Sequence, residues 1–324
     1  MAGNIKYDPD FWKAFEPFAA IPRPVADDAL TQRANSNATL ELVFAMIPET
    51  PGVEETEFKY QTKDGKTLTM YRFTKSATTT DAKKAEKPPS GPAVLFVHGG
   101  GFISGSVPVF RNAITYYVAK TGIPFFAPGY RVAPENPFPG PVDDVYAGLE
   151  WLRDHAKEQD VDPARIALFG PSAGGGLAAG VTLLARDKGF TPPIAKLLLL
   201  YPMLDDRTFV PPDNLLSKFV TWTQKNNEIG WGAYLGPDRS NVSPYAAPAR
   251  ATDVSGFPVT YIDCGSLDLF RDETLAFAAK LAAANIDVEL HLYPGVPHGF
   301  EAPFWDTPVS QKAQEIRVWA LRDL

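Results

Sequence analysis

The amino-acid sequence predicts a three-layer α/β domain in which helices cover both faces of a mostly parallel sheet. Short apolar runs without a period-two pattern recur along the 324 residues, as strands buried on both faces require. Between these runs, apolar residues return at helical spacing. Hydrophobic residues make up 45% of the chain and charged residues 21%, which is typical of a folded globular protein. Strand–helix alternation in such a chain indicates an α/β domain.

Eight strands are expected. The first two, at 53–61 and 67–75, flank Asp64-Gly65, which is a hairpin-turn signal. Residues 288–292 alternate strictly between apolar and polar types, so we expect a half-exposed strand at the edge of the sheet. The buried strands between them are expected at 93–97, 123–127, 165–169, 194–200 and 258–262.

Helical patterns separate and follow these strands. Apolar residues at helical spacing predict helices over 142–152 and 309–320. The segment 75–92 is small, polar and rich in lysine, and it ends in prolines, so we expect an exposed loop there.

Two segments do not fit the strand–helix order. Residues 1–50 begin a helix at Asp8-Pro9 and carry the aromatic stripe Phe11, Phe15 and Phe18. Residues 205–235 interrupt the order and carry Phe209, Phe219, Trp222 and Trp231. Either segment can pack as ordinary core. Together they can instead form a lid over the carboxyl edge of the sheet, where open α/β sheets bind ligands.

Charge and cysteine content narrow the class of protein. The chain holds 31 Lys and Arg against 38 Asp and Glu, a net charge of −7, so nucleic-acid binding is not expected. Its single cysteine, Cys264, cannot form an internal disulfide. The N-terminal residues lack a secretory signal pattern, and no apolar stretch approaches the roughly 20 residues of a membrane span. We therefore expect a cytoplasmic protein without a membrane span.

The sharpest chemical signal is Gly170-Pro171-Ser172-Ala173-Gly174. It follows a predicted buried strand and opens a glycine-rich helix. That context is typical of a nucleophile elbow, a tight turn that lifts a serine hydroxyl above the sheet. A glycine-rich turn with an incidental serine is the alternative. No Lys-Ser/Thr pair follows the glycines, which argues against a phosphate loop.

A second glycine run lies at the end of the 93–97 strand, in His98-Gly99-Gly100-Gly101-Phe102. Three successive glycines expose backbone N–H groups that no side chain shields. Such groups can stabilise a developing oxyanion, at about 3–4 kcal/mol for each donor. A flexible turn is the alternative for this run taken alone.

A serine nucleophile needs a base and an acid. Of the four histidines, His298 lies in a loop after the last predicted strand, where it can reach a nucleophile. The others adjoin the glycines, end a polar helix or lie in the edge strand (His98, His155, His291). The acid is expected between serine and histidine in the chain. Asp268 lies in a loop there, and Asp263 at the end of the 258–262 strand is its main rival. Asp272 and Glu273 suit a first helical turn.

These motifs together resemble the hormone-sensitive-lipase family of α/β-hydrolases, the microbial carboxylesterases with an HGGG signature. The similarity covers nearly everything from Ala93 to the C-terminus. Its motifs include His98-Gly-Gly-Gly-Phe102, Tyr130-Arg-Val-Ala-Pro-Glu135, Leu200-Tyr201-Pro202, Asp268-Leu-Phe-Arg-Asp272 and His298-Gly-Phe300. Because several independent motifs occur in the same order as in the family, the resemblance is not accidental.

The resemblance implies an α/β-hydrolase fold, with a mostly parallel eight-stranded sheet flanked by helices and a helical cap. The cap would consist of residues 1–50 and 205–235, which favours the lid interpretation of these two segments. The catalytic core would then consist of residues 51–204 and 236–324.

The resemblance also assigns the roles at the site. It implies the nucleophile, acid and base Ser172, Asp268 and His298. It places the oxyanion donors on the backbone N–H groups of Gly100, Gly101 and Ala173. Two residues depart from the family pattern. Pro171 replaces an Asp before the nucleophile, and Leu269 replaces a Pro after the acid. Because the missing carboxylate alters the pocket floor, Pro171 bears on substrate preference rather than on the triad.

These features predict a serine carboxylesterase that cleaves small-molecule esters with short acyl chains through an acyl-enzyme. A lactone, carbamate or arylamide hydrolase would use the same residues. A non-catalytic receptor of the same fold, like the gibberellin receptors, is a further alternative, although those lose the histidine. The sequence shows no cluster with metal-ligand spacing, so no metal or organic cofactor is expected. The edge strand 288–292 offers a surface through which two copies could pair.

Overall fold

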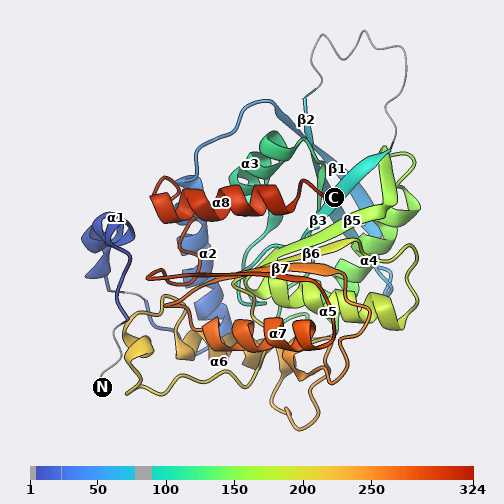
Figure 1. Ribbon diagram of the computed structural model, residues 1–324. Coiled ribbons are helices and arrows are strands. Elements are labelled where there is room, and N and C mark those ends of the chain that lie inside the picture. Colours follow the sequence, from blue (N-terminus) through green and yellow to red (C-terminus); the bar gives the residue numbers. More distant parts are fainter. Residues whose placement is uncertain (1–4, 23, 77–89) are drawn as a thin grey trace.

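An eight-stranded sheet forms the centre of the molecule, in the spatial order β1-β2-β4-β3-β5-β6-β7-β8 (Figure 1). This computed structural model describes residues 5–22, 24–76 and 90–324. The strands are β1 (Val53–Gln61), β2 (Thr67–Lys75), β3 (Gly91–Phe96), β4 (Phe125–Pro128), β5 (Val161–Pro171), β6 (Lys196–Leu200), β7 (Val259–Gly265) and β8 (Val288–Tyr293). Strand β2 pairs antiparallel with β1 and β4, and every other neighbouring pair is parallel. The predicted mostly parallel sheet of eight strands is confirmed.

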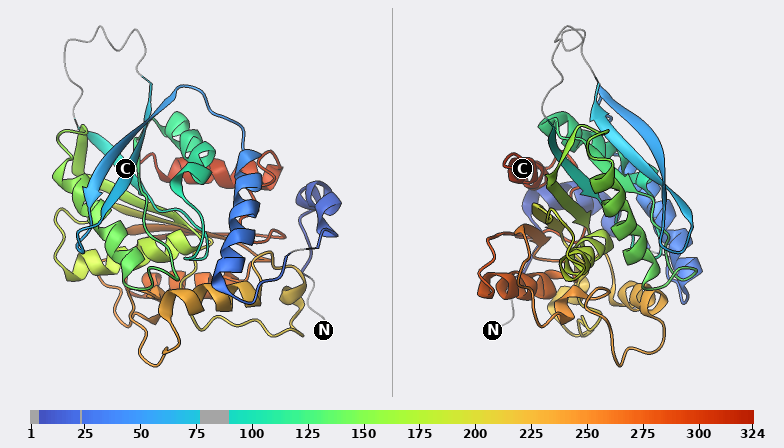
Figure 2. Two further views of the ribbon diagram at one scale, coloured as in Figure 1. Left: turned by 180° about the vertical axis from the view of Figure 1, so that it is seen from behind. Right: turned by 90° about the vertical axis from the view of Figure 1, so that its right-hand side faces the viewer.

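Helices cover both faces of this sheet, as Figure 2 shows from two sides. The α-helices are α1 (Pro9–Ala19), α2 (Ala29–Ala45), α3 (Arg111–Thr121), α4 (Gly140–Asp154), α5 (Ala173–Asp187), α6 (Gln224–Leu235), α7 (Arg271–Ala283) and α8 (Pro308–Ala320). Short 3-10 turns lie at η2 (Val107–Phe110), η3 (Leu215–Lys218) and η4 (Pro248–Arg250). Within the described ranges, no helix is both long enough and apolar enough to cross a membrane.

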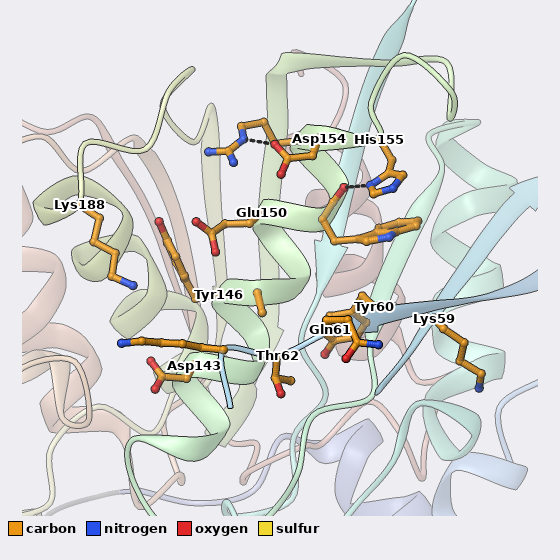
Figure 3. Close-up of a pocket in the computed structure, with 14 residues that line it drawn as sticks. Lys59, Tyr60, Gln61, Thr62, Asp143, Tyr146, Glu150, Asp154, His155 and Lys188 are labelled. Carbon is orange, nitrogen blue, oxygen red and sulfur yellow. Dashed lines mark hydrogen bonds and ion pairs between the residues drawn. The ribbon is translucent and has the colours of Figure 1, made fainter. Parts of the chain in front are cut away.

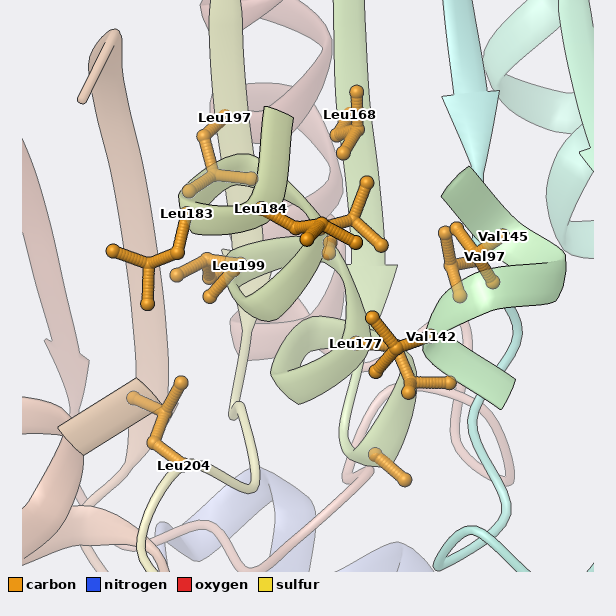
Figure 4. Close-up of a cluster of buried hydrophobic side chains, with 14 of the residues drawn as sticks. Val97, Val142, Val145, Leu168, Leu177, Leu183, Leu184, Leu197, Leu199 and Leu204 are labelled. Carbon is orange, nitrogen blue, oxygen red and sulfur yellow. The ribbon is translucent and has the colours of Figure 1, made fainter. Parts of the chain in front are cut away.

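Two large apolar clusters hold the layers together. On one face of the sheet, α4, α5 and α7 pack against the strands through aliphatic side chains such as Val145, Leu177 and Leu199 (Figure 4). On the other face, α3 and α8 pack against a cluster that includes Phe125 and Phe169. Burial of this apolar area, at about 25 cal/mol per Å², is the main force that fixes the sheet between its helices.

The termini of the predicted elements follow the local signals in the sequence. The Asp8 side chain caps α1 by accepting hydrogen bonds from the N–H groups of Asp10 (3.1 Å) and Phe11 (2.9 Å), and Pro9 occupies the first helical position. The β1–β2 hairpin turns at Asp64-Gly65, and Gly65 has φ of 76°. Both predictions are confirmed. Most of the loop expected at 75–92 lies outside the described residues.

Strand β8 lies at the edge of the sheet, as its alternating pattern predicts. Its Leu290 and Leu292 side chains are exposed. Pairing of two copies through this edge stays a prediction.

The prediction that the 258–262 strand ends at Ile262 is wrong. Strand β7 continues to Gly265, so Asp263 lies within the sheet rather than at a strand end. Its carboxylate is fully buried and accepts two hydrogen bonds from the Arg317 guanidinium, at 2.6 Å and 3.0 Å. Periodicity placed the boundary too early because the chain after Ile262 stays buried without staying apolar.

Arg317 on α8 joins two carboxylates in the interior. Besides Asp263, it donates from Nη1 to Glu301 Oε1 (2.6 Å), which also accepts a hydrogen bond from the Tyr201 hydroxyl (2.7 Å). Burial raises the pKa of the Asp263 carboxyl. A buried cation between two carboxylates is costly to remove, because its loss leaves uncompensated charge in the interior.

We predict that Arg317→Leu lowers the free energy of unfolding by about 3–5 kcal/mol, because two buried carboxylates lose their cation. Urea denaturation followed by circular dichroism measures this loss. Arg322→Leu, at an exposed position on the following turn, is the control and should change stability by less than about 0.5 kcal/mol. A loss below about 1 kcal/mol for Arg317→Leu would mean that the cluster contributes little.

Candidate active site

Ser172 occupies the sharp turn between β5 and α5. Its backbone has φ 57° and ψ −126°, a region that non-glycine residues rarely adopt, and such strain costs about 1–3 kcal/mol. Neighbouring backbone holds it there: Ser172 N donates to Leu200 O (2.8 Å), and Met203 N donates to Ser172 O (3.0 Å). Gly174 permits the turn, since a Cβ atom there would lie 2.0 Å from Val97 O. The predicted elbow geometry is present.

His298 lies beside this serine. Its Nε2 atom is 2.9 Å from Ser172 Oγ, and its Nδ1 atom is 2.7 Å from Asp268 Oδ2. Since a carboxylate only accepts, Nδ1–H donates to Asp268, and this leaves Nε2 able to accept the serine proton. The rings of Tyr201 and Phe270 meet the imidazole edge-on, with centroids 4.8 Å and 5.1 Å away.

Asp268 is the carboxylate that reaches the histidine. It is completely buried in the turn between β7 and α7, and its Oδ1 atom accepts a hydrogen bond from Phe270 N (2.9 Å). Its rival Asp263 is engaged by Arg317, and Glu273 accepts hydrogen bonds from the N–H groups of Leu204 (2.5 Å) and Asp205 (3.2 Å). The structure thus brings Ser172, His298 and Asp268 into one hydrogen-bonded chain.

The glycine loop (residues 98–105) lies against the same turn. Gly100, at φ 129°, occupies a conformation that suits glycine alone, and its carbonyl accepts hydrogen bonds from Ser104 N (3.0 Å) and Ser104 Oγ (2.7 Å). In a planar trans peptide the next N–H points away from that carbonyl, so the N–H of Gly101 lies on the side opposite Ser104. Within the described residues, the N–H groups of Gly100, Gly101 and Ala173 donate to no protein atom.

His98 supports the glycine loop and is a residue whose part sequence reasoning missed. Its ring is fully buried, stacks on Tyr130 with centroids 4.1 Å apart, and has Nδ1 2.8 Å from Gly99 O. Burial lowers the pKa of His98 to about 4, so the ring is neutral at pH 7 and Nδ1–H donates to that carbonyl. The signal available in the sequence was its position directly before the glycines.

A cavity of about 440 Å³ opens above Ser172 and His298. Its aromatic wall consists of Phe11, Phe15, Phe18, Phe300 and Phe304, and its α2 side carries Gln32, Asn35, Ser36 and Thr39. Pro171, at the position where the resemblance implies an aspartate, lies in the cavity lining beside Ser172. Of the aromatic residues noted in 205–235, Trp222 lines the cavity, whereas Trp231 is buried against Phe102 and Phe209 is exposed.

The segments predicted as a cap contact the glycine loop and the loop that carries His298. Thr221 Oγ1 donates to His298 O (3.1 Å), and the Trp222 indole covers Gly101, where an added Cβ would lie 2.5 Å from the ring. From α2, Arg33 Nε donates to Ile103 O (2.6 Å), and Asn37 Oδ1 accepts a hydrogen bond from Gly105 N (2.9 Å). Sequence periodicity could not show these contacts because each joins elements far apart in the chain.

A second pocket, of about 610 Å³, lies between the β1–β2 hairpin and α4 (Figure 3). Charges of both signs line it, and several already have partners. Arg153 Nε donates to Asp154 Oδ1 (2.8 Å), and Lys188 lies over the Tyr146 ring at 4.2 Å. None of the predicted site residues lines this pocket. Among the described residues, no group of three His, Cys, Asp or Glu side chains could hold a metal ion in either pocket.

Comparison with known proteins agrees with this geometry. The chain is 31% identical over 234 residues to "Esterase LipI" of Mycobacterium tuberculosis, which covers 71% of this chain and 72% of the relative. It is 33% identical over 221 residues to "Carboxylesterase NlhH" of the same organism, covering 64% and 66%. A solved structure titled "Bacterial Heroin Esterase" superposes with a TM-score of 0.85 at 34% identity, over 98% of both chains.

A profile of the family described as "alpha/beta hydrolase fold" matches residues 94–302. That span begins in β3, includes the glycine loop, Ser172 and Asp268, and ends just after His298. The chain therefore belongs to the α/β-hydrolases, and within them to the hormone-sensitive-lipase family that its motifs predict.

Proposed function

We propose that the chain hydrolyses short-chain carboxylic esters through an acyl-enzyme formed on Ser172. The single observation that carries this proposal is the hydrogen-bonded chain from Ser172 through His298 to Asp268, at 2.9 Å and 2.7 Å. The relatives named esterase and carboxylesterase support the same reaction class.

The first half-reaction forms the acyl-enzyme. As Ser172 Oγ bonds to the ester carbonyl carbon, its proton passes to His298 Nε2, and the carbonyl π electrons move to the oxygen. Asp268 keeps the imidazole in the tautomer that can accept this proton, and it stabilises the imidazolium that results. When the tetrahedral intermediate collapses, the bond to the alcohol oxygen breaks and His298 returns the proton to the departing alcohol.

The second half-reaction repeats these steps with water. His298 Nε2 takes a proton from a water molecule, whose oxygen attacks the acyl carbon. When this second intermediate collapses, the bond to Ser172 Oγ breaks, His298 gives the proton to Oγ, and the carboxylic acid leaves. In both halves the oxyanion would face the N–H groups of Gly100, Gly101 and Ala173, which donate to no other atom of the described chain. Preorganised donors of this kind stabilise the charge that develops in the transition state.

We further propose that residues 1–50 and 205–235 form a cap over this site, as the family resemblance implies. Side chains of α1 and α2 and of the 221–226 segment line the cavity above Ser172. Such a cover would limit the space for the substrate above Ser172.

Ser172→Ala should reduce ester hydrolysis to below about 1% of wild type, because the nucleophile is lost. The melting temperature should stay close to that of the wild type, since only one hydroxyl is removed. Release of 4-nitrophenol from 4-nitrophenyl butyrate measures the activity. Residual turnover above that level would overturn the assignment of the nucleophile.

Asp268→Asn should lower kcat by about 10⁴, because His298 loses the carboxylate that selects its tautomer. Asp263→Asn is the matched control. It should act mainly on the melting temperature, since Asp263 pairs with Arg317 rather than with His298. Measuring kcat for both variants at one pH tests this prediction. A large loss of kcat for Asp263→Asn with a small loss for Asp268→Asn would mean that Asp263 is the acid.

The cavity should favour short acyl chains, because Phe11, Phe15 and Phe304 close its α1 side. We expect kcat/KM for 4-nitrophenyl esters from acetate to hexanoate to exceed that for dodecanoate. A chain-length series in one buffer measures this preference. Faster hydrolysis of emulsified long-chain triglyceride than of soluble butyrate would contradict it.

A further inference from the structure

Most of the described residues that line the cavity above Ser172 are apolar, and none of them is Asp, Glu, Lys or Arg. A polar group of a substrate that enters such a cavity loses its hydration, so it needs a hydrogen-bond partner in the lining.

One side of the cavity is nevertheless polar. Gln32, Asn35, Ser36 and Thr39 lie at positions i, i+3, i+4 and i+7 of α2, a spacing that places them on one face of the helix. Asn226 of α6 also lines the cavity. The rest of the described lining is mostly apolar, and α2 itself adds Leu40, Leu42, Val43 and Phe44 to it.

Gln32 stands out among these residues because it is only 4% exposed. Its Nε2 atom donates to Ser36 Oγ (3.0 Å), but its Oε1 atom is shielded from solvent and accepts no hydrogen bond within the described chain. Trp222, which also lines the cavity, carries the complementary group, an indole Nε1–H that is equally shielded and has no acceptor among the described residues. Buried polar atoms usually have partners, so two exceptions in one binding cavity call for a reason.

We propose that this cavity selects esters that carry a hydroxyl group outside the scissile bond. A hydroxyl is both donor and acceptor, so it can donate to Gln32 Oε1 and can accept from Trp222 Nε1–H. The proposal rests on the esterase function argued above and adds the substrate class to it.

The test compares paired esters that differ only in hydroxyl groups. One pair is 2,3-dihydroxypropyl butyrate and propyl butyrate, with the hydroxyls on the alcohol part. The other pair is ethyl 3-hydroxybutyrate and ethyl butyrate, with the hydroxyl on the acyl part. For each enzyme, the measured quantity is the ratio of kcat/KM between the hydroxylated ester and its partner.

In Gln32→Met the ratio should fall about tenfold in at least one pair, which corresponds to about 1.4 kcal/mol. Methionine keeps the length of the side chain and removes its acceptor. Gln159→Met is the matched control. Gln159 is also buried, at 7% exposed, and its Oε1 atom also accepts no hydrogen bond from the described residues, but it does not line the cavity. Its ratio should match that of the wild type.

Trp222→Phe is a second variant that tests the proposal even if Gln32→Met fails to fold. It keeps an aromatic ring above Gly101 and removes the N–H, so the ratio of kcat/KM between the hydroxylated ester and its partner should fall. Unchanged ratios in both pairs would overturn the proposal. An equal loss for both members of a pair would overturn it too, since a bound water rather than the substrate would then satisfy Gln32. Hydrolysis of none of the four esters by the wild type would instead overturn the esterase function itself.

Discussion

Parallel pairing of β3, β5, β6, β7 and β8 is the constraint on which the rest of the structure depends. The carboxyl ends of parallel strands meet at one edge of a sheet, so the turns that follow them become neighbours whatever their distance in the chain. The glycine loop follows β3, Ser172 follows β5, Asp268 follows β7 and His298 follows β8. The elbow also needs adjacency of β3 and β5, because Gly174 of α5 packs directly on the Val97 carbonyl. The strand order alone therefore places these four segments next to one another at one edge of the sheet.

Behind that edge, a buried ionic cluster ties the same strands to the C-terminal helix. Arg317 of α8 bridges Asp263 in β7 and Glu301, which lies three residues beyond His298. Through Glu301 it also reaches the Tyr201 hydroxyl, and the Tyr201 ring meets the His298 imidazole edge-on. Breaking such a cluster is costly because it strands buried charge. The helix therefore stabilises the loop that carries the histidine, although it contributes no group to the cavity.

Features of this structure that depend on neighbouring residues could be predicted from the sequence, whereas those that depend on contacts between distant residues could not. Strand–helix order, the hairpin turn, the cap of α1 and the elbow at Ser172 follow from signals within a few residues, and all were predictable. Asp263 was harder, because its pairing with Arg317 joins positions 54 residues apart and leaves no periodic trace. The orientation of α2, which turns Gln32 toward the cavity, depends on packing between segments and was beyond sequence reasoning for the same reason.

The two segments expected to cover the site also contact the glycine loop and the His298 loop. Each segment makes a different set of these contacts. Helix α2 holds the glycine loop through Arg33 and Asn37, while the 205–235 segment reaches the His298 carbonyl through Thr221 and lays Trp222 over the glycines. A backbone with three successive glycines has little stiffness of its own. Its conformation must then come from the groups packed around it, and some of these belong to the two segments rather than to the sheet. Displacing either segment would therefore disturb the geometry of the glycine loop.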